Sequence, residues 1–99
     1  MDLVELTAEM SRFVTSQGWY APDSPRPQTP RNLAASLAIE AAEALELFQW
    51  SEKPAPQEAL AGELADVLLY LLQLASVSGI DLEKAALEKL DENYGRHWE

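Results

Sequence analysis

The stretch that decides the fold runs from Glu40 to Asp66. It begins Glu40-Ala-Ala-Glu43 and ends Glu63-Leu-Ala-Asp66, so each end holds two acids three residues apart. Three residues turn an α-helix by about 300°, which places both acids of a pair on nearly the same face, one turn apart. Apolar residues surround both pairs. Two antiparallel helices joined within this stretch would bring the four carboxylates together.

Four clustered carboxylates repel one another, and burial raises the free-energy cost of their charge. A divalent cation removes that cost. The chain has no Cys and a single His, and ligation by carboxylates alone suits a hard ion such as Mg²⁺ or Mn²⁺. Mg²⁺ commonly takes substrate phosphates as further ligands. The pattern therefore predicts a metal site that handles phosphate. The alternative is a pair of solvated helix faces, since Glu is a good helix former.

Length and composition limit the class of protein. The 99 residues, 47% of them hydrophobic, predict one globular domain over residues 1–99. The formal net charge of −10 argues against a nucleic-acid polymer or an anionic membrane as partner. The first residues lack the pattern of a signal peptide. Together with the absence of Cys, this leads us to expect a cytoplasmic protein.

Capping and breaking residues predict the helix boundaries. Asp2, Thr29 and Asp81 are good N-caps, glycines follow the first and third helices, and Pro54 and Pro56 should break the central stretch. The resulting all-α prediction has helices over residues 3–17, 30–50, 57–78 and 82–96.

The segment 19–29 holds Pro22, Pro25 and Pro27, which rule out a helix there. It is long enough to act as a lid over a site, or it is a plain surface connection.

The third predicted helix is apolar nearly all round between Val67 and Val77, as expected for a helix buried on every side. The acids just before this run argue against a membrane span. A chain of this size can hardly cover such a helix alone, so we expect a homodimer or a homotetramer.

Lys89, Asn93 and Arg96 are spaced i, i+4 and i+7 on the last predicted helix. The spacing aligns two cations and an amide along one face, and such a row suits a polyphosphate. The alternative is a solvated helix end, where cations are favourable in any case.

Trp19, Trp50 and Tyr70 are candidates for contact with a nucleobase, because aromatic faces stack on any base. Tyr70 follows Asp66 by four residues and so shares its helix face. The alternative for each aromatic residue is a place in the core.

The chain resembles the MazG-like family of all-α nucleoside triphosphate pyrophosphohydrolases, in particular the branch that contains the dCTP pyrophosphatases. The likeness covers nearly the whole chain. It lies in the two acidic pairs and in the following segments: Pro30-Arg-Asn-Leu33, Glu43-Ala-Leu-Glu-Leu-Phe-Gln-Trp50, Glu63-Leu-Ala-Asp-Val-Leu-Leu-Tyr70 and Lys89-Leu-Asp-Glu-Asn-Tyr-Gly-Arg96. The chain departs from that branch at Met10, where a His is common, and in a longer segment 20–28.

The resemblance implies a four-helix fold whose helical hairpins pair on oligomerisation. It also implies Mg²⁺-dependent hydrolysis of a (deoxy)nucleoside triphosphate to the monophosphate and pyrophosphate, which would clear surplus or non-standard nucleotides. Glu40, Glu43, Glu63 and Asp66 would hold the metal, with Glu43 the first choice and Glu40 the second for a catalytic role as proton acceptor. The last helix would bind the phosphates through Lys89, Asn93 and Arg96, and the base pocket would use Trp19, Trp50 and Tyr70. The competing hypothesis is a non-enzymatic helical dimerisation module with solvated acidic faces.

Overall fold

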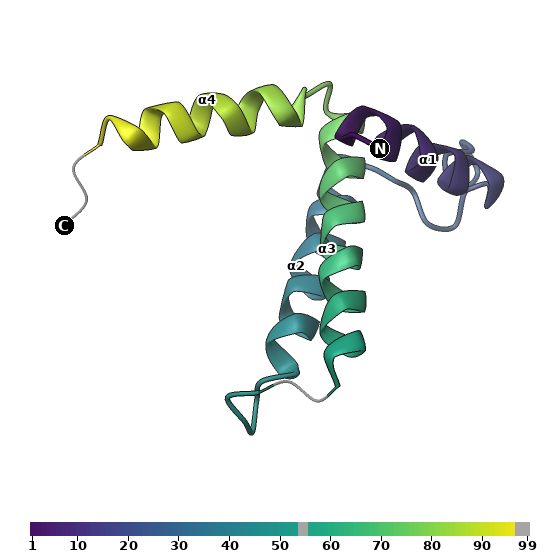
Figure 1. Ribbon diagram of the computed structural model, residues 1–99. Helices are drawn as coiled ribbons and strands as arrows, with labels where there is room; N and C mark the ends of the chain where they lie inside the picture. Colours follow the sequence, from purple (N-terminus) through teal and green to yellow (C-terminus); the bar gives the residue numbers. More distant parts are fainter. Residues whose placement is uncertain (54–55, 97–99) are drawn as a thin grey trace.

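The computed structural model describes residues 1–53 and 56–96. Within these ranges the chain is all-α, as predicted, with helices α1 (Leu3–Ser16), α2 (Pro30–Glu46), α3 (Gln57–Val77) and α4 (Leu82–Tyr94). Figure 1 shows α2 and α3 side by side as an antiparallel hairpin, with α1 across one end of it and α4 extending away from the same end. The predicted break at Pro54 and the single His97 lie outside the described residues.

A small core holds α1 against α3. Met10 and Val14 of α1 are buried against Leu72 of α3, because they recur at helical spacing on one face of α1. Leu33 is buried at the start of α2. This packing fixes the end of the hairpin to which the segment 19–29 is attached.

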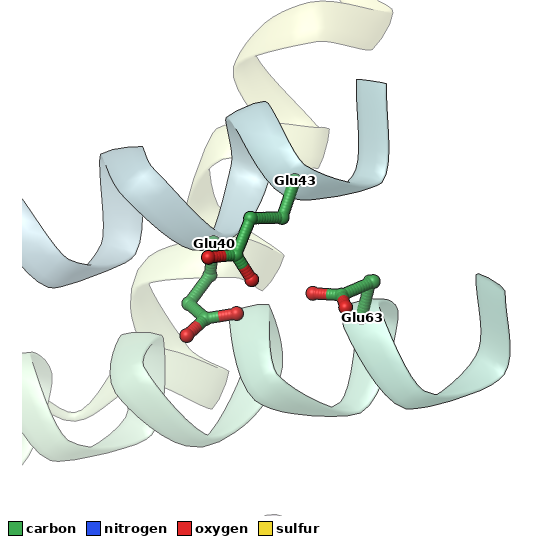
Figure 2. Close-up of side chains that lie close together, drawn as sticks. All are labelled: Glu40, Glu43 and Glu63. Carbon is green, nitrogen blue, oxygen red and sulfur yellow. The ribbon is translucent and has the colours of Figure 1, made fainter. Parts of the chain in front are cut away.

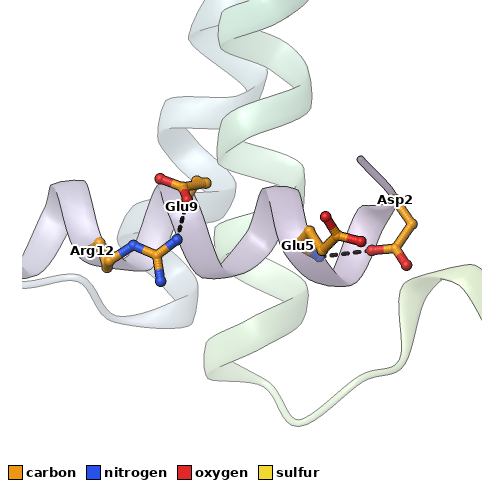
Figure 3. A network of polar contacts seen from close by, with 4 residues as sticks. All are labelled: Asp2, Glu5, Glu9 and Arg12. Atoms are coloured by element: carbon orange, nitrogen blue, oxygen red, sulfur yellow. Dashed lines mark hydrogen bonds and ion pairs between the residues drawn. The ribbon is translucent and has the colours of Figure 1, made fainter.

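The helix starts follow the predicted caps. The Asp2 carboxylate accepts a hydrogen bond from the Glu5 backbone N–H at 2.8 Å, and Glu9 pairs with Arg12 one turn further along α1 (Figure 3). Thr29 caps α2 by accepting from the Asn32 N–H at 3.2 Å. These contacts satisfy N–H groups that have no partner within their own helix.

All four helices end earlier than predicted, α1 and α3 by one residue and α2 and α4 by more. We expected the second helix to reach residue 50, but α2 ends at Glu46 and continues as tight turns. In these turns the N–H groups of Phe48 and Gln49 donate to carbonyls three residues back. We expected the fourth helix to reach residue 96, but α4 ends at Tyr94.

By length and composition α3 could cross a membrane. It packs against both α1 and α2, however, and presents Glu63 toward α2 (Figure 2). We therefore interpret α3 as one of the two helices of the hairpin, with 17% of its apolar stretch buried within one chain.

Candidate functional site

Three carboxylates meet between the helices of the hairpin. Glu40 and Glu43 project from α2 toward Glu63 on α3 (Figure 2), and one oxygen of each lies within 4.8 Å of the others. All three side chains are half-buried. The spacing of three residues on α2 and the antiparallel packing of α3 produce this convergence, as the sequence predicted.

The electrostatics of the cluster favour protonation of two of its acids. Burial, together with the nearby carboxylate of Glu43 and the charge of Asp66, raises the pKa of Glu40 from 4.5 to about 7. Burial and the approach of Glu43 also raise the pKa of Glu63. Both shifts follow from removing negative charge from water and placing it beside like charge.

The cluster also has polar atoms that need a partner. Among the described residues, one oxygen of Glu40 and one of Glu63 are buried and accept no hydrogen bond. Buried carboxylate oxygens are normally hydrogen-bonded or bound to a cation. Two oxygens on opposite sides of Mg²⁺ lie about 4.2 Å apart, since each Mg–O distance is about 2.1 Å. The donor set and the spacing therefore fit a hard divalent cation, with only small side-chain movements.

Asp66 lies beside this group. It is exposed and is not one of the three residues whose oxygens meet. Its charge nevertheless contributes to the raised pKa of Glu40. Asp has one methylene fewer than Glu, so its carboxylate reaches less far from α3. The predicted role of Asp66 as a fourth ligand stays a prediction.

Two cavities share Trp19 and Tyr70 in their linings, and one of them is also lined by Asp66. One, of about 380 Å³, lies between α1 and α3 and is lined by Asp66, Tyr70 and Trp19 among mainly apolar side chains. The other, of about 290 Å³, lies under the segment 19–29 and is also lined by Trp19 and Tyr70. The structure thus brings together two of the three aromatic residues that the sequence singled out.

Trp19 is held by its neighbours on two sides. Its ring packs edge-on against Phe13, with centroids 5.7 Å apart. The guanidinium of Arg26 lies over the same ring, 5.9 Å from its centroid, a distance at which a cation is attracted to the aromatic face. Trp19 therefore joins α1 to the proline-rich segment.

The remaining predicted site residues lie elsewhere in this chain. Trp50 follows α2 and is 90% exposed. Lys89 lies on α4, which extends away from the acidic hairpin (Figure 1), and pairs with Glu92 at 3.3 Å. Asn93 is on the same helix, and Arg96 lies two residues beyond its end. Within one chain, α4 is not placed over the three carboxylates.

The sequence analysis missed three residues of these cavities. Gln73 is buried and lines the larger cavity, while Gln28 and Arg26 line the smaller one. Only the i, i+7 spacing of Gln73 from Asp66 pointed to a shared helix face. No local signal places the proline-rich segment against α3.

Fold and site together define an all-α protein in which three carboxylates that could hold a metal ion meet between the two helices of a hairpin. Comparison with known proteins narrows this class. Residues 35–98 match the model of the MazG-like family. The chain therefore belongs to the MazG-like family.

Individual relatives agree with this assignment. The chain is 44% identical over 77 residues to dCTP pyrophosphatase 1 of Bos taurus, a match that covers 69% of this chain and 46% of that protein. The human protein of the same name is also 44% identical to this chain, and that match covers 69% of this chain and 45% of the human protein. A crystal structure of a pyrophosphatase from Archaeoglobus fulgidus superposes with a TM-score of 0.81 at 34% identity, over 96% of this chain and 91% of that one. The chain spans about half the length of the curated relatives it matches.

Proposed function

We propose that this protein is a metal-dependent nucleoside triphosphate pyrophosphohydrolase. The observation that carries the proposal is the convergence of Glu40, Glu43 and Glu63, two of which leave a buried oxygen without a hydrogen-bond partner among the described residues. Family membership and relatives named dCTP pyrophosphatase support the same reaction. The products are a nucleoside monophosphate and pyrophosphate, and the role is removal of surplus or non-standard nucleotides.

Mg²⁺ is the cation that we assign to the three glutamates, with Asp66 as an additional ligand from the next turn of α3. When bound, it supplies a Lewis acid for the phosphoryl oxygens and lowers the pKa of a bound water. The side chain of Glu43 projects from α2 toward those of Glu40 and Glu63 (Figure 2), and we assign to it the proton of the attacking water. Glu40 is the second choice for that role.

The nucleoside is held in the larger cavity, between α1 and α3, which Asp66 lines. Trp19 and Tyr70 line it, and both offer aromatic faces on which a base can stack. Trp50 is 90% exposed after α2 and does not line this cavity within one chain. A deoxycytidine nucleotide is the substrate that we favour, since the relatives carry dCTP in their names.

Phosphate binding by Lys89, Asn93 and Arg96 requires a second copy of the chain. Helix α4 extends away from the hairpin of its own chain (Figure 1). The neighbouring groups that shift the pKa of Glu40 are all carboxylates. A phosphate near these acids needs cations. We therefore assign the three residues of α4 to the acidic site of a partner chain in a homo-oligomer.

The test is the identity of the products. Each of the common ribo- and deoxyribonucleoside triphosphates is incubated with the protein and Mg²⁺, and then with chelator. We expect monophosphate and pyrophosphate with Mg²⁺ only, and loss of turnover in Glu43→Gln. Release of orthophosphate would contradict the proposal. An absence of turnover with every triphosphate would favour the non-enzymatic dimerisation module.

A further inference from the structure

The larger cavity holds a deeply buried polar side chain. Gln73 is 4% exposed and lines the cavity together with Asp66 and Tyr70. An amide buried among apolar groups costs free energy unless its polar atoms are hydrogen-bonded. A leucine would fill the same space without that cost, so the amide calls for an explanation other than packing.

Two successive hydrogen bonds fix the orientation of this amide. Gln28 Nε2 donates to the backbone carbonyl of Arg26 at 2.6 Å. Because a carbonyl cannot donate, Gln28 must turn its NH₂ group toward Arg26, which leaves its Oε1 as an acceptor. Gln73 Nε2 donates to that Oε1 at 2.5 Å. The carbonyl end of the Gln73 amide is therefore turned away from Gln28 and can accept a further hydrogen bond.

The position of Gln73 along α3 matches the length of a nucleotide. Asp66, Tyr70 and Gln73 all line the cavity, and their spacing places them on one helix face. Gln73 lies seven residues beyond Asp66, which is about 10.5 Å along the axis at about 1.5 Å per residue. A nucleoside monophosphate spans a similar length from its phosphate to the edge of its base. With a phosphate at Asp66, which we assign as an additional ligand of the metal, the base would reach Gln73.

We propose that Gln73 selects cytosine over uracil, because its Oε1 accepts a hydrogen bond from the exocyclic amine of cytosine. Gln28 is the positioning residue that holds the Gln73 amide in this orientation. Uracil carries a carbonyl oxygen at the corresponding place. Two acceptors would then face each other, and the buried Gln73 oxygen would lose its partner. This inference rests on the proposed function, because it assumes that a nucleotide occupies the cavity.

The kinetic test compares dCTP with dUTP. The variants are Gln73→Met, which keeps an unbranched side chain but removes the amide, and Gln57→Met, the same change at an exposed position of α3. We expect the parent and Gln57→Met to prefer dCTP in kcat/KM by about tenfold or more, as sites built around a hydrogen bond do. Gln73→Met should lose most of that ratio, and Gln28→Ala part of it. Equal losses for both substrates in Gln73→Met, or a parent without the preference, would overturn the proposal.

A binding test separates this inference from the proposed reaction. Calorimetry of dCMP and dUMP with the same proteins requires no turnover. We expect tighter binding of dCMP by the parent and equal binding of the two by Gln73→Met. If no triphosphate is hydrolysed but this difference in binding is found, the reaction is wrong and the base selection stands. If triphosphates are hydrolysed and the difference is missing from both tests, the reaction stands and the base selection is wrong.

Discussion

Glu40 keeps its proton in the folded chain over a pH range in which the unfolded chain has released it. Its pKa rises from 4.5 to about 7 on folding. Between these values the folded state binds more protons than the unfolded state, so the free energy of unfolding falls as pH rises. The raised pKa of Glu63 acts in the same direction. The contribution of Glu40 and Glu63 to the stability of the metal-free hairpin is therefore greatest below pH 4.5.

Glu40→Gln should flatten this dependence. The variant removes the titrating group and its repulsion with Glu43, so its metal-free melting temperature should fall less than that of the parent between pH 4.5 and pH 7. The control is Glu88→Gln, which removes the same charge from an exposed position of α4. Mg²⁺ should raise the melting temperature of the parent by binding the folded form, and that of Glu40→Gln less. Parallel melting curves for all three proteins would contradict the prediction.

At the scale of single residues, the sequence analysis predicted the cluster of acidic side chains but did not predict the hydrogen bond between two glutamine side chains. Glu40, Glu43 and Glu63 converge because their local spacing and the hairpin together determine the geometry. The Gln73–Gln28 hydrogen bond joins residues 45 positions apart. A contact of that kind depends on how a loop folds back over the chain, and no helical or turn pattern encodes it.

The start of each helix was easier to predict than its end. Thr29 and Pro30 mark the start of α2 in the sequence, and the structure uses both. No glycine or proline follows Glu46 until Pro54. The helix therefore ends by tightening to hydrogen bonds across three residues, a change that depends on the turn of the hairpin as a whole.

The packing of α1 on α3 depends strongly on Leu72, which is 2% exposed. Leu72→Ala should lower the free energy of unfolding by about 2–5 kcal/mol, because it removes buried methyl groups and leaves a cavity. The matched control is Leu45→Ala on α2, where Leu45 is 72% exposed and the cost should stay within about 0.5 kcal/mol. Urea unfolding of both variants measures the difference. Equal midpoints would show that this core does not hold α1 in place.

As a whole molecule, the chain leaves much apolar surface uncovered. Leu64 of α3 and Leu87 of α4 are more than half exposed, as is Ile39 of α2. Exposed apolar surface on this scale is typical of chains that associate. We expect light scattering at micromolar concentration to give a mass of two or four chains. A particle of 11.0 kDa across that range would contradict the expectation.

Complementation between chains tests the place of α4. Glu43→Gln damages the acidic site, and Arg96→Ala damages the phosphate contacts that we assign to the partner. In a mixed oligomer, intact acids of an Arg96→Ala chain can meet the intact α4 of a Glu43→Gln chain. We expect the mixture, refolded together, to exceed the activity of either variant alone. The control is the same mixture combined without refolding. Activity equal to the average of the two variants would place both groups in one chain or remove Arg96 from the site.

The buried oxygens of Glu40 and Glu63 that lack a hydrogen-bond partner in the described part of the chain have a consequence for the lifetime of the protein in a cell. A hairpin strained by its own charge opens locally more often than one in which that charge is neutralised, and proteases cut open segments. Scarcity of divalent cations would thus shorten the half-life of the chain, and an ample supply would preserve it. The abundance of the protein would then follow the availability of the ion that we assign to its acids.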